Sequence, residues 1–226
     1  MSLPAPPVSA IEDRDRAPAR DPVAVWIDRA LQGDAAAMRS LLAALAPVVM
    51  RAARRLLGRG HPDVDDVAQQ ALVGVIERLP GFRGESSLGH FAERIAVYRA
   101  LTARRDARFR QRLAAQAADA DVDDGVAPES PFAIAASRAR LALLREALDA
   151  VSPPQAEALA LHFLFDRTIA EIAAMTDSAE ETVRSRLRLG KQALRTKIEK
   201  DGRFRALREG VVENTVAPPA GKEEEP

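Results

Sequence analysis

The stretch that decides the fold lies near the C-terminus, where residues 168–195 read TIAEIAAMTDSAEETVRSRLRLGKQALR. Its apolar residues recur at helical spacing on both sides of a short polar break. Thr168 with Glu171, and Ser178 with Glu181, each have the spacing of a helix-capping box. The pattern predicts a short helix, a tight turn and a second, longer helix, which is the arrangement of a helix-turn-helix.

The second helix of this pair has two contrasting faces. Val183, Leu187 and Leu194 form an apolar stripe, and residues 182–200 contain seven basic side chains and one acidic one. A helix lying in the major groove of DNA needs apolar support behind it and long cationic side chains in front. Taken alone, the helix could also be an ordinary solvated amphipathic helix. The candidates for reading duplex DNA are Thr182, Arg184, Ser185, Arg186, Arg188 and Lys191.

A second helical region precedes this stretch. Its clearest apolar face has members at i, +3, +4, +7, +8, +11 and +15, namely Val64, Val67, Ala68, Ala71, Leu72, Val75 and Leu79. Upstream, a further face runs from Met38 to Leu56, and Pro47 is expected to kink or split that helix. The glycines and proline of residues 80–87 predict a loop.

The fold class predicted is all-α, with two small helical domains joined by a flexible acidic linker and the helix-turn-helix in the second domain. Aromatic residues make up only 4% of the chain, so the apolar mass is mostly Ala, Leu and Val, which favours helices. The expected parts are a disordered leader (1–21), a first domain (22–112), the linker (113–137), a second domain (138–200) and a flexible tail (201–226).

The formal net charge of zero conceals an uneven distribution of charge. Residues 22–112 carry 15 basic and 9 acidic side chains, whereas residues 113–137 carry 5 acidic side chains and no basic one. Binding to phosphates depends on local clusters of cations, not on the total, so the balanced charge does not exclude a nucleic-acid partner.

Several classes of function are disfavoured. The chain has no cysteine, which excludes disulfides and thiolate metal sites, and its three histidines are scattered. We find no constellation typical of a catalytic site, so we expect neither an enzyme nor a metal or other cofactor. No apolar run approaches the roughly 18–20 residues of a membrane span, and no signal peptide is evident, so we expect a cytoplasmic protein without membrane insertion.

Two long segments resemble a known family. EALDAVSPPQAEALALHFLFDRTIAEIAAMTDSAEETVRSRLRLGKQALR is similar to the C-terminal promoter-reading domain of extracytoplasmic-function sigma factors. QGDAAAMRSLL and ARRLLGRGHPDVDDVAQQALVGVIERLPGFRGESSLGHFAERIA resemble the N-terminal domain of the same family. The resemblance covers about residues 22–200 and implies core RNA polymerase, promoter DNA and an anti-sigma factor as partners.

The resemblance assigns roles to particular positions. It implies that core polymerase is gripped by Asp65, Asp66, Gln69 and Gln70. It implies that the single-stranded minus-ten element is captured by a loop and the helix after it, with candidates Arg83, Glu85, Ser86, His90, Phe91, Arg94, Tyr98 and Arg99. Melted DNA needs a pocket for an unstacked base and cations for the backbone. For Phe91 core packing is an alternative, and for His90 a surface position. The duplex readers named above then address the minus-thirty-five element.

Some positions depart from the family pattern. Phe91 and Tyr98 stand where a Trp and an Asn are common, and Val73-Gly74-Val75 replaces bulkier residues. The turn 177–181 reads DSAEE, which puts two acids at the start of the reading helix. The main hypothesis is a sigma factor that directs core polymerase to specific promoters and assists melting. The alternative is a divergent sigma-like regulator that binds DNA or polymerase without initiating.

Overall fold

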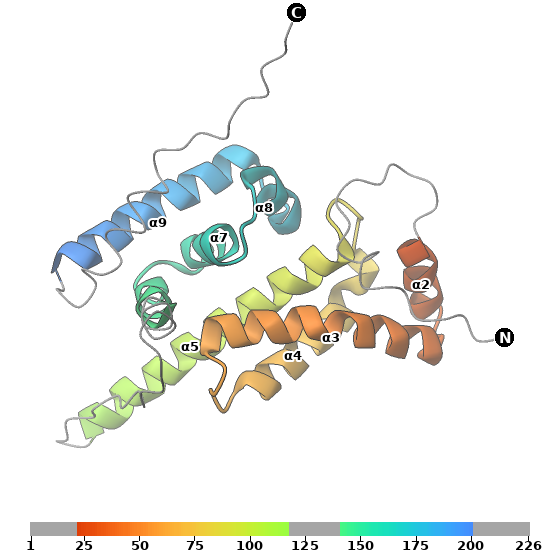
Figure 1. The fold of residues 1–226 in the computed structure, drawn as a ribbon, viewed down its shortest axis with the longest axis horizontal. Helices are drawn as coiled ribbons and strands as arrows, with labels where there is room; N and C mark the ends of the chain where they lie inside the picture. The colour runs from red at the N-terminus through yellow and green to blue at the C-terminus, as the bar shows by residue number, and fades with distance from the viewer. Residues whose placement is uncertain (1–21, 118–140, 201–226) are drawn as a thin grey trace, which may run out of the picture.

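The computed structural model describes residues 22–117 and 141–200, and the regular structure in these two ranges is helical. The predicted leader, most of the predicted linker and the predicted tail lie outside the described residues. The helices fall into two groups, as the predicted fold class requires (Figure 1). We call the group before the gap the N-terminal part and the group after it the C-terminal part.

The N-terminal part is a bundle of three long helices with shorter elements at its ends (Figure 1). Its elements are α2 (Pro22–Leu31), α3 (Ala35–Leu57), α4 (Val64–Arg78), the short 3-10 helix η1 (Leu79–Gly81) and α5 (Leu88–Ala117). The apolar face predicted for α4 forms part of the core, with only Leu72 partly exposed. The 3.6-residue period therefore identified the correct face of this helix.

The helix α3 begins at a capping residue and contains a proline in its interior. Asp34 caps its start, because the carboxylate accepts hydrogen bonds from the backbone N–H of Ala36 at 2.9 Å and of Ala37 at 3.0 Å. The expectation that Pro47 would split the helix is wrong, since α3 runs unbroken through it. Pro47 is exposed, so the carbonyl that lacks a backbone partner lies on the solvent side, where water can hydrate it.

α3 also contradicts the expectation that no apolar run approaches the length of a membrane span. By length and composition alone, this helix of 23 residues could cross a membrane. Ten of its residues are buried, and the helix packs against both α4 and α5. Its hydrophobicity is thus the kind that a core helix of a bundle requires.

The C-terminal part contains the helix-turn-helix. Residues 141–148 are helical, followed by α7 (Pro153–Leu164), α8 (Ile169–Thr176) and α9 (Glu180–Lys200). The capping box at the start of α8 is confirmed: the Thr168 hydroxyl accepts from the N–H of Glu171 at 3.2 Å, and the N–H of Thr168 donates to the Glu171 carboxylate at 2.8 Å.

The second predicted capping box is wrong. α9 begins at Glu180, one residue later than a cap at Ser178 would require. The Ser178 hydroxyl instead donates to the carbonyl of Thr176 at 3.2 Å and accepts from Arg186. Asp177 adopts the left-handed conformation (φ 48°), which ends α8 and makes the turn tight. The turn therefore depends on backbone geometry at Asp177 and not on a reciprocal cap.

α9 lies close against α7 because of one glycine. A Cβ at Gly190 would lie 2.8 Å from Cδ1 of Leu159, a side chain of α7 that is only 1% exposed. Any larger residue at this position would push the two helices apart. Gly190 therefore fixes how the reading helix sits on the rest of the C-terminal part.

The two parts pack against each other along α5. This helix has 30 residues and continues to Ala117, beyond the domain boundary predicted at 112. Figure 1 shows α7, α8 and α9 on one side of α5, with α3 and α4 on the other, and α5 contacts both α7 and α8. The periodicity of single helices gave no sign of this packing.

Candidate polymerase and nucleic-acid interface

The four predicted polymerase-binding residues share one exposed face of α4. Asp65, Asp66, Gln69 and Gln70 are all exposed, and the amide of Gln70 donates to the Asp66 carboxylate at 2.7 Å. They follow the i, +1, +4, +5 spacing that places residues on one side of a helix. Their acceptor groups thus face solvent, ready to pair with donors on another protein.

Two apolar residues extend this face, and the sequence reading did not assign them to it. Val73 is 46% exposed and Ile76 is 38% exposed. They follow Gln69 and Gln70 at helical spacing, which was the signal that could have found them. Large apolar side chains left in solvent next to a polar rim are typical of a protein-binding surface.

The departure at Gly74 has a packing reason. A Cβ at this position would lie 3.1 Å from the side chains of both Arg78 and Ile95. Gly74 therefore lets α4 and α5 approach closely, and a side chain at this position would require Arg78 and Ile95 to shift.

The predicted minus-ten loop is mostly exposed. Arg83 lies between two carboxylates, 3.8 Å from Glu85 and 3.9 Å from Asp177 of the helix-turn-helix. Ser86 is half-buried and makes one long contact, 3.5 Å from its hydroxyl to the carbonyl of Ser87. The neighbouring Ser87 accepts from the N–H of His90 at 3.1 Å and so caps α5. Ser87 thus has a structural role in capping α5, which the sequence analysis did not predict.

His90 and Phe91 lie in the first turn of α5 and differ in their surroundings. His90 is only 7% exposed, which contradicts the alternative of a surface position. It lines a cavity of about 240 Å³ between the two parts, together with Glu93 and Arg167. The half-buried ring of Phe91 packs against Phe82 with centroids 5.0 Å apart, as the packing alternative proposed. Neither side chain is fully open to DNA in this arrangement.

A second cavity lies one turn further along α5. It has a volume of about 90 Å³, and its walls are Arg78, Phe91, Arg94, Ile95, Tyr98 and Glu157. Tyr98 is 47% exposed, and the buried Nε of Arg99 has no hydrogen-bond partner among the described residues. The sequence reading did not include Arg78, which comes from the end of α4. An aromatic ring beside guanidinium groups suits an unstacked base and its phosphate.

Arg94 is not free to contact DNA here. Its Nε donates to the carboxylate of Glu157 at 3.1 Å, and Glu157 lies on α7 of the C-terminal part. The residue predicted to hold the melted strand is therefore paired with the other part of the chain.

The predicted duplex readers lie along α9 and differ in whether they are already paired with other residues of the chain. The guanidinium of Arg184 is paired with Glu180 at 2.6 Å and with Glu181 at 3.6 Å. Arg186 is half-buried and donates to the Ser178 hydroxyl at 3.2 Å. Arg184 thus balances one of the two acidic charges at the start of the helix, and this pairing reduces what Arg184 can offer to phosphate.

The remaining predicted duplex readers form no ion pair among the described residues. Lys191 lies over the ring of Phe163, with its Nζ 5.2 Å from the ring centroid. Thr182 is exposed and Ser185 is half-buried. Arg188 is exposed and makes no ion pair or hydrogen bond with any side chain among the described residues. Arg188 is therefore the cation of this set best placed to bind phosphate.

Comparison with family models explains why these two surfaces occur in one chain. The model for sigma-70 region 2 matches residues 41–110, and the model for sigma-70 region 4 matches residues 141–194. Together the two models cover 124 of the 226 residues, in the predicted order. The chain belongs to the sigma-70 family. Its N-terminal part contains region 2 and its C-terminal part contains region 4.

This assignment confirms that the chain is a sigma factor with the predicted DNA-binding helix-turn-helix in its second part. It makes the chain a transcription initiation factor with core RNA polymerase and promoter DNA as its partners.

Thirteen chains of solved structures match this chain, and two of them are described here. One is the sigma factor RpoE in complex with the anti-sigma factor NepR from Bartonella quintana, with 18% identity, a TM-score of 0.41, and coverage of 76% of this chain and 99% of that one. The other is CnrH in complex with the cytosolic domain of CnrY, with 22% identity, a TM-score of 0.46, and coverage of 78% and 97%. The comparison with curated proteins gave no match.

Proposed function

We propose that this sigma factor binds core RNA polymerase through α4, captures the minus-ten strand with the loop before α5 and with α5 itself, and reads the minus-thirty-five duplex with α9. In this way it directs polymerase to specific promoters and assists their melting, without a catalytic site of its own. One observation carries the proposal: regions 2 and 4 follow each other in one chain, and each presents predicted contact residues on an exposed helix face. Its place of action would be the cytoplasm.

The polymerase contact is the step that separates a sigma factor from other DNA-binding proteins. The exposed Asp65 makes no side-chain hydrogen bond or ion pair among the described residues, so replacing it should leave the fold intact. Asp65→Lys would place a cation opposite the donors that the face is proposed to meet. Because juxtaposed like charges cost several kcal/mol at an interface, core binding should weaken by about tenfold or more.

The test is in-vitro transcription and core binding with purified core enzyme. Asp28→Lys is the matched control, since Asp28 is an exposed acid on α2 of the same part. The proposal expects promoter-dependent transcripts from wild type and from Asp28→Lys, and strongly reduced transcripts from Asp65→Lys. Absence of core binding by the wild-type protein, with no promoter-dependent transcripts, would refute the function.

An anti-sigma factor is proposed as a further partner. RpoE and CnrH are each bound to another protein in the solved structures described above. Purification of the tagged protein from its own cells, followed by a test of whether the bound protein blocks core binding, would examine this.

A second function has specific support. Arg184 is neutralised by the acids beside it, and Phe91 packs on Phe82 instead of facing solvent. Both features favour a sigma-like regulator that binds DNA or polymerase but melts promoters poorly. Permanganate footprinting separates the two: bound promoter without reactive thymines supports the regulator, and reactive thymines near the start site support the initiating factor.

A further inference from the structure

One large apolar side chain of the reading helix is exposed to solvent. Leu189, in the third turn of α9, is 42% exposed, whereas Val183, Leu187 and Leu194 are at most 5% exposed. Those three residues form the buried stripe on the side of α9 that packs against α7 and α8. Leu189 therefore adds less than they do to the packing of region 4, and its side chain is available to a ligand.

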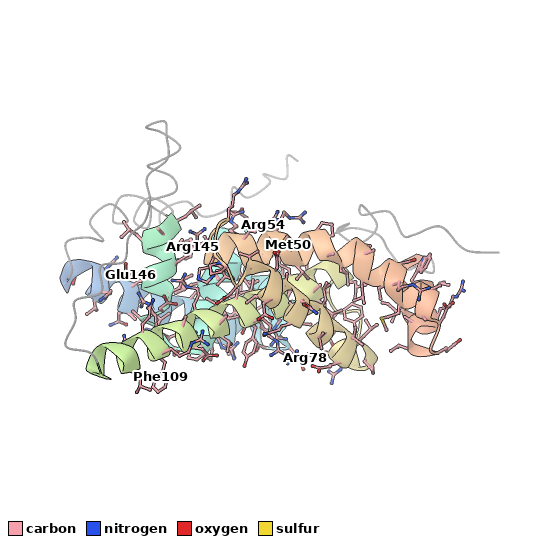
Figure 2. The ribbon with its side chains drawn as sticks, turned by 90° about the horizontal axis from the view of Figure 1, so that it is seen from below. Met50, Arg54, Arg78, Phe109, Arg145 and Glu146 are labelled. Carbon is pink, nitrogen blue, oxygen red and sulfur yellow. The ribbon has the colours of Figure 1, made fainter. Side chains whose placement is uncertain are left out.

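Leu189 is not part of an extended apolar surface among the residues that the structure describes. Its neighbours one turn before and one turn after it are the polar residues Ser185 and Gln192. The most exposed large apolar residue, Phe109, lies on the side of α5 opposite the helix of residues 141–148 (Figure 2). Protein-binding surfaces are normally contiguous apolar patches, so the isolation of Leu189 argues against a protein partner for it.

The geometry of α9 places Leu189 in a row that faces away from the rest of region 4. Residues three and four apart lie above one another on a helix, so Ser185, Leu189 and Gln192 form one row. At 3.6 residues per turn this row lies on the side of α9 turned away from the buried stripe. The side chain of Gln192 is exposed and makes no hydrogen bond among the described residues. The row is thus open to a ligand that approaches α9 from solvent.

A stripe of cations runs beside this row. Arg184, Arg188 and Arg195 follow one another at i, +4 and +11, and all three are exposed. Arg188 forms no ion pair among the described residues. Phosphates border the major groove, so cations beside the row would attach α9 to one strand and turn the row toward the base edges.

The first turn of α9 is less suited to reading bases. The side chain of Glu181 is 84% exposed, and Arg184 balances only one of the two charges of Glu180 and Glu181. The remaining negative charge repels phosphates. The uncharged row that begins at Ser185 is therefore the part of the helix best suited to lie close to the base edges.

An exposed leucine in the major groove selects for one chemical group. Its side chain has no hydrogen-bond donor or acceptor, so it gains nothing from the polar edges of guanine, cytosine or adenine. The C5-methyl group of thymine is the apolar group that base edges present in this groove. Contact between the two removes apolar surface from water, whereas a polar edge facing Leu189 would lose water without gaining a hydrogen bond.

We propose that Leu189 is a specificity-determining residue that recognises a thymine of the minus-thirty-five duplex through its C5-methyl group, while Arg188 holds a neighbouring phosphate. The inference rests on the proposed function, in which α9 reads this duplex, and adds the base and the chemical group that are selected. Burial of one methyl group against Leu189 corresponds to about a fourfold change in affinity.

Uracil tests the methyl group alone, because it lacks the C5-methyl of thymine and retains the same hydrogen-bonding groups. The full-length protein first selects duplexes from a random pool, which supplies a preferred sequence. Each thymine of that sequence is then replaced in turn by uracil, and the affinity is measured by fluorescence anisotropy. We expect one position at which uracil weakens the binding of the wild-type protein about fourfold.

The variants assign this effect to the leucine. Leu189→Ala should weaken binding to the thymine duplex about fourfold and should abolish the further effect of uracil at that position. Leu189→Met keeps an apolar side chain of similar volume and should still distinguish thymine from uracil. The matched control is Leu31→Ala, since Leu31 on α2 is 44% exposed and lies outside the proposed contact surfaces. The control should bind like the wild type, and circular dichroism checks that each variant folds.

The contrary results separate the inference from the proposed function. The inference alone is overturned if the protein selects a sequence in which no thymine is sensitive to uracil, or if the sensitivity persists in Leu189→Ala. It is equally overturned if Leu189→Ala weakens binding to core RNA polymerase and leaves the affinity for DNA unchanged, because the leucine would then contact protein. A wild-type protein that enriches no sequence would reject duplex reading by α9 in the proposed function, and the inference with it.

Discussion

Arg188→Ala should weaken the binding of region 4 to duplex DNA through the loss of one phosphate contact. Arg188 is exposed and has no ion pair among the described residues, so it can neutralise a phosphate without first leaving another partner. Arg184 on the preceding turn is different, because it is already held by Glu180 at 2.6 Å and Glu181 at 3.6 Å.

The size of the effect follows from counterion release. Each neutralised phosphate contributes about 0.9 to the slope of log affinity against log salt. Between about 50 mM and about 200 mM salt, a fourfold change, one contact is therefore worth about a 3.5-fold change in affinity. Arg188→Ala should reduce the slope by about 0.9. The paired change Arg184→Ala with Glu180→Gln leaves the net charge constant and should alter the slope much less, because an exposed ion pair contributes about 0–1 kcal/mol.

The assay is fluorescence anisotropy of a labelled duplex titrated with protein at several salt concentrations. A duplex of arbitrary sequence suffices, since phosphate contacts do not depend on the bases. Two results would refute the reasoning: a wild-type slope in Arg188→Ala, or an equal loss of slope in the charge-neutral pair. The first would mean that α9 does not present Arg188 to DNA, and the second that Arg184 contacts phosphate in spite of its acidic partners.

Three further predictions concern folding stability. Gly190→Ala should destabilise the protein by roughly 1 kcal/mol, because overpacking against Leu159 (about 1–3 kcal/mol) outweighs the gain in helix propensity (about 1 kcal/mol), measured by urea denaturation. Thr168→Ala should cost about 0.5–2 kcal/mol in the same assay, because the first turn of α8 loses its cap. Hydrogen bonds from the N–H of Ala37 and from Arg29 lower the pKa of Asp34 below its ordinary value of 3.8. The contribution of Asp34 to folding stability is therefore present above pH 3.8 and is lost as the pH falls through the lower pKa of the folded state. Asp34→Asn should flatten this dependence of stability on acid pH.

Each of these predictions has a control and a contrary result. Ala193→Gly, also on α9, controls for helix propensity, and a stabilised Gly190→Ala would show that Leu159 yields without cost. Thr168→Ser retains a hydroxyl and should fall near wild type, whereas an equal loss in both variants would exclude the cap. For Asp34, the melting temperature is followed from about pH 6 to about pH 2. An unchanged acid slope in Asp34→Asn would assign that slope to other carboxylates.

Much of the fold could be predicted because its signals are local. The buried face of α4 and the cap at Thr168 depend on residues within a few turns of each other. Errors arose where one local signal competed with another. Pro47 does not break α3, because its ring faces solvent, and Ser178 does not cap α9, because Asp177 makes the turn by adopting a left-handed conformation.

The site was only partly predictable for a related reason. Exposure of Asp65 and of Arg188 follows from the period of a single helix, and the sequence sufficed for it. The pairing of Arg94 depends on a helix more than 60 residues away in the chain, and the cavity beside the buried His90 is lined by residues as distant as Val48 and Arg167. Val73 and Ile76 lie at helical spacing from Gln69 and Gln70, so the sequence could also have assigned them to the proposed polymerase-binding face.

The sequence by itself determined the helical class, the order of regions 2 and 4 and the set of residues that face outward on each helix. These properties follow from helical periodicity, capping and charge, which act over a few residues. Only the tertiary structure decided that Glu93, Asp149 and Glu157 meet arginines across the interface, because such contacts join residues 45 to 74 positions apart. Nothing in the spacing of charges along a chain indicates which of them will be brought together when helices pack.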